Sequence, residues 1–168
     1  MGLFGKNKEV SYDSSRLSGI LSEDCAFEGT LIFEGLLRID GHLTGKIICR
    51  PNCSATLIIG KTGHVDVDLL IVDDLIVAGQ LFGKGPIIAL NKADLHGKSR
   101  VEVQKNSSLY CSNLSVKGQA LFQGKSAMIR HESDETKSKI KKLIFDNKKE
   151  LINEPFKVNP ILKKISNR

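Results

Sequence analysis

The sequence predicts an all-β protein that is wound as a parallel β-helix of about six coils. Three observations predict this fold: glycines recur at a long spacing, apolar and polar residues alternate between them, and no Asn-Gly dipeptide interrupts the alternation. We expect residues 1–25 to form a disordered N-terminal tail and residues 26–129 to form the β-helix. Residues 130–168 are expected to be a basic C-terminal tail, partly helical or disordered.

Five glycines mark the long repeat, each within a short distance of an apolar residue. These glycines are Gly41, Gly60, Gly79, Gly97 and Gly118, and the successive spacings between them are 19, 19, 18 and 21 residues. Glycine reaches backbone angles that other residues avoid, so it allows the chain to turn a corner. A repeat of this length indicates that each unit is one coil of a stacked architecture.

A period of two runs beneath the glycines. From residue 27 to residue 49 the odd positions are apolar or glycine, and most even positions are polar, which is typical of strands with one side facing inward. The run exceeds one ordinary strand of about 3–10 residues, so we expect the chain to bend without reversing. Three strands of about six residues then close one coil, and residues 26–129 give about six coils in a rod roughly 29 Å long.

The distribution of charge argues against nucleic acid as a partner. Residues 26–129 hold eleven basic and nine acidic side chains, a net charge of +2, whereas residues 130–168 hold eleven and six, a net charge of +5. A nucleic-acid-binding domain carries a basic face with interleaved aromatic residues on its folded part.

The longest apolar runs are about four residues, far below the ~20 of a membrane span. With no apolar signal core at the N-terminus, we expect a cytoplasmic protein.

The cysteines do not predict a metal site. Four cysteines in a chain without an export signal are interpreted as free thiols and small apolar residues; they are Cys25, Cys49, Cys53 and Cys111. The spacing from Cys49 to Cys53 is half of a zinc site at most, because no second pair at finger spacing accompanies it. No metal and no cofactor are therefore expected.

The alternative function is that of a hexapeptide-repeat acyltransferase or a related metal-binding enzyme, which are also β-helical. Such enzymes need a histidine between coils or three histidine ligands on neighbouring coils. The histidines are His42, His64, His96 and His131. Their separations of 22, 32 and 35 residues do not match the length of one coil. His42 stands at an even position and is expected to face solvent. We therefore predict that the protein is not an enzyme and has no catalytic residues.

The β-helical segment resembles the bactofilins, a family of bacterial cytoskeletal proteins that form polymers. The resemblance is carried by residues 27–41 (FEGTLIFEGLLRIDG), by Gly45-Lys46-Ile47, by residues 57–60 (LIIG) and by residues 120–128 (ALFQGKSAM). It implies a right-handed, three-faced β-helix that assembles end to end without nucleotide. It also implies a membrane-associated scaffold that acts in cell shape or in placing cell-wall enzymes.

The two ends of the β-helix are the predicted sites of self-association. An open β-helix has an unpaired row of N–H and C=O groups at each end, and stacking of a second copy would satisfy them. Neither end shows a strongly amphipathic segment that would cover it. The apolar residues predicted to lie at these ends are Phe27, Leu31, Phe33, Leu121, Phe122 and Met128.

The first eight residues are a candidate membrane contact. Two large apolar residues stand beside two lysines, so the segment can place its apolar side chains among lipid headgroups while the lysines meet anionic lipid. The residues assigned to this contact are Met1, Leu3, Phe4, Lys6 and Lys8. Short N-terminal segments of this kind target many bactofilins to membranes, so the resemblance supports the same interpretation.

The basic tail has several interpretations. Apolar residues fall near helical spacing with lysines between them, at Ile140, Leu143, Ile144, Leu151 and Ile152, and Pro155 and Pro160 end any helix. The tail is a helix that binds a partner, a helix on the membrane surface, a cover for the last coil, or solvated disorder.

Taken together, these features predict a self-polymerising scaffold that needs no nucleotide. Its expected partners are further copies of itself, the inner face of the cytoplasmic membrane, and cell-wall-synthesis or morphogenesis proteins. Its expected location is the cytoplasm, peripheral at the inner membrane.

Overall fold

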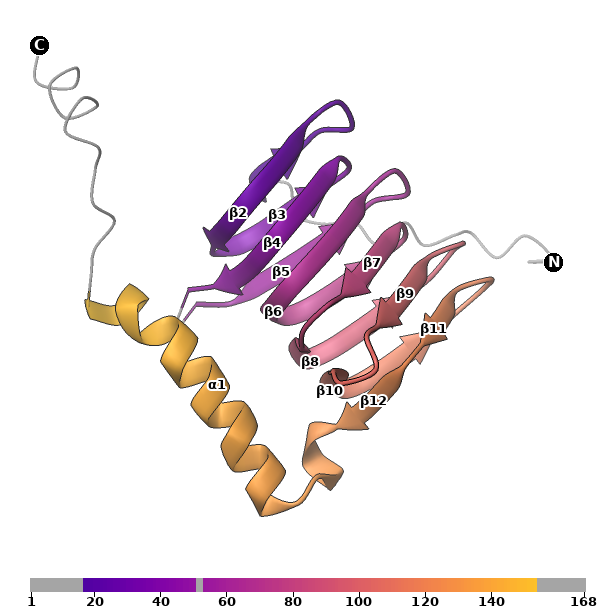
Figure 1. Ribbon diagram of the computed structural model, residues 1–168. Coiled ribbons are helices and arrows are strands. Elements are labelled where there is room, and N and C mark those ends of the chain that lie inside the picture. The colour runs from indigo at the N-terminus through magenta and orange to yellow at the C-terminus, as the bar shows by residue number, and fades with distance from the viewer. Residues whose placement is uncertain (1–16, 51–52, 154–168) are drawn as a thin grey trace, which may run out of the picture.

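The computed structural model describes residues 17–50 and 53–153 and contains a parallel β-solenoid of about six turns, followed by a long helix (Figure 1). The strands form one 12-stranded sheet that wraps around the solenoid, and every pairing among them is parallel. The strands are β1 (Leu17–Leu21), β2 (Ala26–Phe33), β3 (Gly35–Ile39), β4 (His42–Cys49), β5 (Ala55–Ile59), β6 (His64–Val77), β7 (Gln80–Gly83), β8 (Ile87–Leu95), β9 (Arg100–Val103), β10 (Ser108–Val116), β11 (Leu121–Gln123) and β12 (Lys125–Met128). A 3-10 turn (Ile129–His131) and helix α1 (Asp134–Asn153) follow. The predicted fold class is confirmed.

The pairing register divides the solenoid into three faces. The first face consists of β1, β3, β5 and the C-terminal parts of β6, β8 and β10. The second face consists of the N-terminal parts of β2, β4 and β6, followed by β7, β9 and β11. The third face consists of the C-terminal parts of β2 and β4, the middle of β6, the beginnings of β8 and β10, and β12. Each face therefore runs from the first coil to the last.

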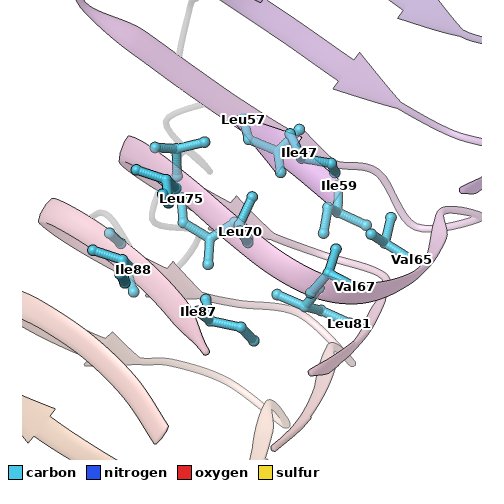
Figure 2. Close-up of a cluster of buried hydrophobic side chains, with 14 of the residues drawn as sticks. Ile47, Leu57, Ile59, Val65, Val67, Leu70, Leu75, Leu81, Ile87 and Ile88 are labelled. Carbon is cyan, nitrogen blue, oxygen red and sulfur yellow. The ribbon is translucent and has the colours of Figure 1, made fainter. Parts of the chain in front are cut away.

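The interior is filled by aliphatic side chains that stack in rows, one residue from each coil. One row on the first face consists of Leu21, Ile39, Ile59, Val77, Leu95 and Val116, each paired in register with the next. Figure 2 shows such side chains from β4, β5, β6, β7 and β8 converging in the interior. Full burial of one such side chain contributes about 1.5–3 kcal/mol. Stacked Leu, Ile and Val thus form the core of a chain that has no Trp.

The predicted alternation holds on the first two coils, with two informative exceptions. Inward residues such as Leu43 and Ile47 are buried, and outward residues such as His42 are exposed. The outward Leu36 and Ile48 are nevertheless buried. The alternation along one strand cannot predict the burial of an outward residue, because that burial depends on what lies over the outside of the face.

Helix α1 covers the third face. Ile48, Ile71 and Ile88 are outward neighbours in register on this face, and all three belong to the core cluster that also contains Ile140 of α1. Leu143 and Ile144 pack against the same cluster. The third face is therefore apolar on both sides, because one side lines the interior and the other lies under a helix.

Two kinds of corner join the faces. Between the first and second faces the coils approach closely at glycines: a Cβ atom on Gly41 would collide with the carbonyl oxygens of Ser22 and Cys25, and one on Gly79 with that of Gly60. Strand β6 instead crosses all three faces without a glycine, and the pairing shifts at Asp68 and between Val72 and Asp74. These bulges absorb the bends of a strand that contains no glycine.

The first coil begins earlier than the sequence analysis placed it. Residues 17–21 form β1, which pairs with β3, whereas the β-helix was expected to begin at residue 26. Five residues with a central glycine carry too little alternation to be recognised as a strand. The C-terminal region, expected to be partly helical or disordered, contains α1 between residues 134 and 153.

We expect Gly79→Ala to destabilise the solenoid by several kcal/mol. The added methyl group would meet the backbone of the preceding coil, and backbone cannot move aside without breaking the stack. Gly19→Ala is the matched control, because its Cβ would meet only Leu37 at 3.5 Å, an ordinary contact. Urea denaturation followed by circular dichroism measures the free energy of unfolding of both variants. Equal stability of the two variants would contradict the close-approach explanation.

We expect Asp74→Asn to raise the thermal midpoint at neutral pH. Burial raises the pKa of Asp74 above its ordinary value of 3.8, while Lys92 opposes the shift and Asp73 adds to it. A raised pKa means that this group stabilises the fold at low pH and that the contribution is lost as pH rises through the folded-state pKa. The gain in Asp74→Asn should therefore shrink as pH falls toward about 3.8, whereas the exposed Asp68→Asn should show no gain. Thermal melts at several pH values measure this, and an unchanged midpoint at pH 7 would contradict it.

Candidate functional site: the two ends of the solenoid

The first coil ends the solenoid with an apolar surface. Phe27, Leu31 and Phe33 of β2 are in register with inward residues of β4, so they too point toward the interior. Phe33 is buried and the other two are half-buried, since no coil precedes theirs among the residues that the structure describes. Ile20 of β1 is 56% exposed.

The last coil presents a second apolar surface. Phe122 and Met128 are in register with the buried Val101 and Cys111 and are half-buried. Val116 ends the row of the first face and is 48% exposed. Its inward position and its exposure together show that the core continues to the end of the solenoid, where no residue of the described ranges forms a lid over this row.

Both ends carry strand edges without a neighbour among the described residues. At the first coil, β1 pairs only with β3 and β2 pairs only with β4; at the last, β11 pairs only with β9 and β12 only with β10. Each edge presents backbone N–H and C=O groups at the spacing of a parallel ladder. Such edges can extend the ladder into a second copy of the chain.

Helix α1 does not lie across the last coil. The chain leaves β12 through the 3-10 turn, and Ser133 then begins α1 by accepting a hydrogen bond from the backbone N–H of Thr136 at 3.2 Å. Figure 1 shows α1 running back along the solenoid toward β4, and Ile140 anchors it to the third face. The interpretation of this segment as a cover for the last coil is therefore wrong for residues 134–153.

The predicted association residues divide between the two ends as expected, with one difference in direction. Leu121 is in register with Arg100, an outward residue, and its side chain is 60% exposed on the second face. It therefore borders the end surface, whereas Phe122 is part of it. The sequence analysis missed Leu21 and Val116. Val116 stands in the repeat unit before Gly118, so the period of the repeat was the signal that could have found it.

The histidine spacing was misinterpreted. His42 and His64 occupy the same register position on neighbouring coils, and their rings stack with centroids 5.1 Å apart. The 22-residue separation still amounts to one coil, because coils differ in length at their corners. His42 is exposed as predicted, and His64 lies 3.8 Å from Asp66.

Cysteine positions agree with their interpretation as small apolar residues in two cases. Cys49 and Cys111 are buried, and burial raises the pKa of the Cys111 thiol. Cys53 donates a hydrogen bond to Glu34 at 3.1 Å, and this carboxylate raises the pKa of the thiol. No group of three or more potential metal ligands occurs among residues 17–50 and 53–153.

Several predicted features lie outside the described residues. These are the candidate membrane contact at residues 1–8 and the tail beyond residue 153. Within the described ranges, no helix combines the length and the apolar character that crossing a membrane requires.

A comparison with protein families identifies the solenoid. The family model described as "Bactofilin: Polymer-forming cytoskeletal" matches residues 19–127, which is the span from β1 to β12. The chain belongs to the bactofilin family. No curated protein and no solved structure matches it.

Membership of the bactofilin family decides the class of function. Bactofilins are polymer-forming cytoskeletal proteins, so this chain is a structural protein and the acyltransferase alternative is excluded. Self-polymerisation follows from the family, and the two open ends are the parts of the described structure best suited to it.

Proposed function

We propose that this bactofilin polymerises end to end, without nucleotide, by stacking terminal coils on one another. The supporting observation is that apolar interior and unpaired strand edge coincide at both ends. Stacking would bury Phe27 and Leu31 at one end and Val116 and Phe122 at the other, and it would pair the exposed backbone groups. Helix α1 leaves both ends accessible because it lies along the third face.

Two arrangements of such a filament are distinguishable. If the first coil of one copy stacks on the last coil of the next, a single type of contact repeats and the filament has a direction. If like ends meet, two different two-fold contacts alternate and the filament has no direction. A variant blocked at only one end separates the two cases, because it leaves single chains in the first and dimers in the second.

We expect Phe122→Arg to abolish filaments under conditions in which the unchanged protein forms them. An arginine buried without a partner at the contact costs about 3–5 kcal/mol, which raises the protein concentration needed for assembly by about 100-fold or more. Electron microscopy without nucleotide detects filaments, and analytical ultracentrifugation then separates monomers from dimers.

Two further variants control this experiment. Phe145→Arg changes a 57% exposed side chain on α1, away from both ends, and is expected to leave filaments unchanged. Val116→Lys alters the same end as Phe122→Arg at a position that is already half exposed, so its fold should survive. Normal filaments from both Phe122→Arg and Val116→Lys would rule out the last coil as a contact.

We further propose that the filament lies at the inner face of the cytoplasmic membrane, tethered by residues 1–8. Leu3 and Phe4 would enter the headgroup region, and Lys6 and Lys8 would meet anionic lipid at about 1 kcal/mol each. One copy binds feebly, but a filament carries many copies and gains by avidity. In this position the filament would act in cell shape or in placing cell-wall enzymes, as the resemblance to bactofilins implied.

We expect deletion of residues 1–8 to abolish flotation of the protein with vesicles that contain anionic phosphatidylserine. Lys6→Glu combined with Lys8→Glu should weaken binding to the same vesicles and remove its salt dependence, because screening acts on the lysine contacts. Vesicles of phosphatidylcholine alone are the lipid control. Equal flotation of the deleted and the complete chain would contradict the tether.

A further inference from the structure

An apolar cluster separate from the core lies on the outside of the first face. Leu36, Ile58 and Ile76 form it. They stand at outward positions of β3, β5 and β6, where Ile58 and Ile76 are neighbours in register. Their side chains are only 7%, 8% and 6% exposed. Outward residues of a sheet are ordinarily polar when water covers the face, so an apolar cluster at these positions is unusual.

A groove lies beside the cluster. Its volume is about 760 Å³, and its apolar lining is formed by Ile58, Ile76 and Ala78, with Gly60 next to Ala78 on the neighbouring coil. The small side chain of Ala78 leaves space in this hollow, whereas the Asp40 carboxylate occupies the place that a side chain on Gly60 would take. We call this hollow the first-face groove.

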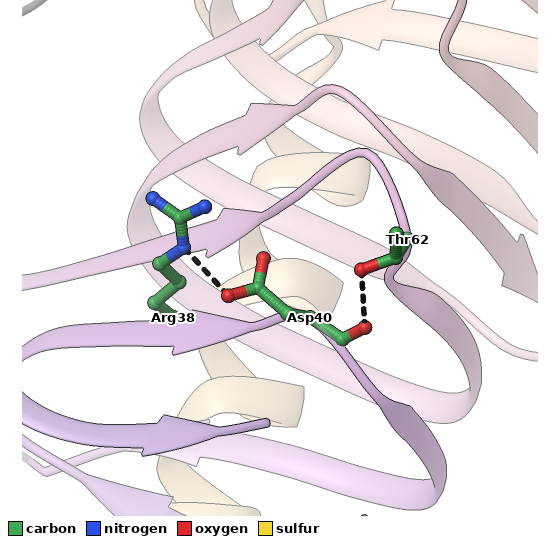
Figure 3. Close-up of polar contacts among 3 residues, drawn as sticks. All are labelled: Arg38, Asp40 and Thr62. Atoms are coloured by element: carbon green, nitrogen blue, oxygen red, sulfur yellow. Dashed lines mark hydrogen bonds and ion pairs between the residues drawn. The ribbon is translucent and has the colours of Figure 1, made fainter. Parts of the chain in front are cut away.

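Polar contacts form one side of the first-face groove. Arg38 Nε and Asp40 Oδ2 are 2.8 Å apart, and Thr62 Oγ1 donates a hydrogen bond to the Asp40 backbone oxygen at 2.7 Å. Figure 3 shows the three side chains along the strand ends and the following corner, and all three line the groove. Arg38 is in register with Ile58, so this ion pair lies directly beside the apolar lining.

We propose that the N-terminal segment of the same chain, residues 1–16, docks in the first-face groove and places Leu3 and Phe4 against Ile58 and Ile76. The chain enters the described structure at Leu17, in β1, which is the first strand of this same face. Fourteen residues extended from β1 to Leu3 reach up to roughly 46 Å. The groove lies within about three coil steps, roughly 14 Å, of β1.

The N-terminal segment fits the groove better than a separate partner does. It is tethered to the face that carries the groove, so its effective concentration there is high. Its two adjacent large apolar residues suit an apolar floor with a polar side. A second copy of the chain would have to approach the face laterally, while the ends provide the strand edges for stacking.

This docking would regulate the membrane contact, a consequence that rests on the proposed tether. Leu3 and Phe4 cannot occupy the groove and the lipid at once, so the apparent membrane affinity is the intrinsic affinity multiplied by the fraction of chains whose segment is undocked. The docking itself does not depend on the tether, and it is measurable without lipid.

The test uses Phe4→Trp in the full chain, which has no other tryptophan. In the absence of vesicles we expect blue-shifted emission and an acrylamide quenching constant several-fold lower than that of a peptide of residues 1–16 with the same change. Adding Ile58→Lys should shift the emission to longer wavelength and raise the quenching constant to the peptide value. Thr44→Lys, an exposed outward position on the second face, is the matched control and should leave both values unchanged.

Three results would overturn the proposal. One is peptide-like quenching in the full chain before any groove substitution. Another is protection that persists in Ile58→Lys and in Ile76→Lys, which would place the segment elsewhere. The third is protection that disappears on dilution, which would assign the contact to a second copy. Absence of vesicle binding by Ile58→Lys, in which the segment is released from the groove, would instead count against the tether alone, so the two proposals fail separately.

Discussion

The structure depends on parallel backbone pairing between successive coils. Each coil donates and accepts along three faces, and the spacing of about 4.8 Å holds every inward side chain directly over its counterpart. Where two coils meet at the corners, as at Gly79 over Gly60, the backbones lie too close for a side chain. A change that separates one pair of coils therefore breaks hydrogen bonds on all three faces together.

The same pairing makes the ends of the solenoid differ from its sides. Along the axis each coil completes the one before, so the first and last coils remain incomplete, with Phe27 at one end and Val116 at the other only partly covered. Across the axis each face is complete, and its outer surface is free to differ. The ladder is thus suited to assembly along one line, and the bactofilin family is polymer-forming.

The outer surfaces of the three faces differ in what they contact. The third face is covered by α1 through Ile140, and the second face is mostly polar and includes the stacked His42 and His64. The first face carries the groove beside Ile58 and Ile76. Because α1 and the groove lie on the sides, neither blocks the ends, and contacts on the sides can act while the chain is part of a polymer.

The sequence by itself determined the parallel solenoid, its number of coils and its inward rows, because alternation and glycine spacing are local properties of the chain. Tertiary structure decided the rest. The His42–His64 neighbourhood depends on bulges and corner lengths that shift the register, and β1 is recognised as a strand only through its pairing with β3. Ile48 and Ile58 have the same alternation as polar outward residues, yet one lies under a helix and the other borders a groove. Which surface an outward residue meets is set by segments distant in the chain, and no local pattern contains that information.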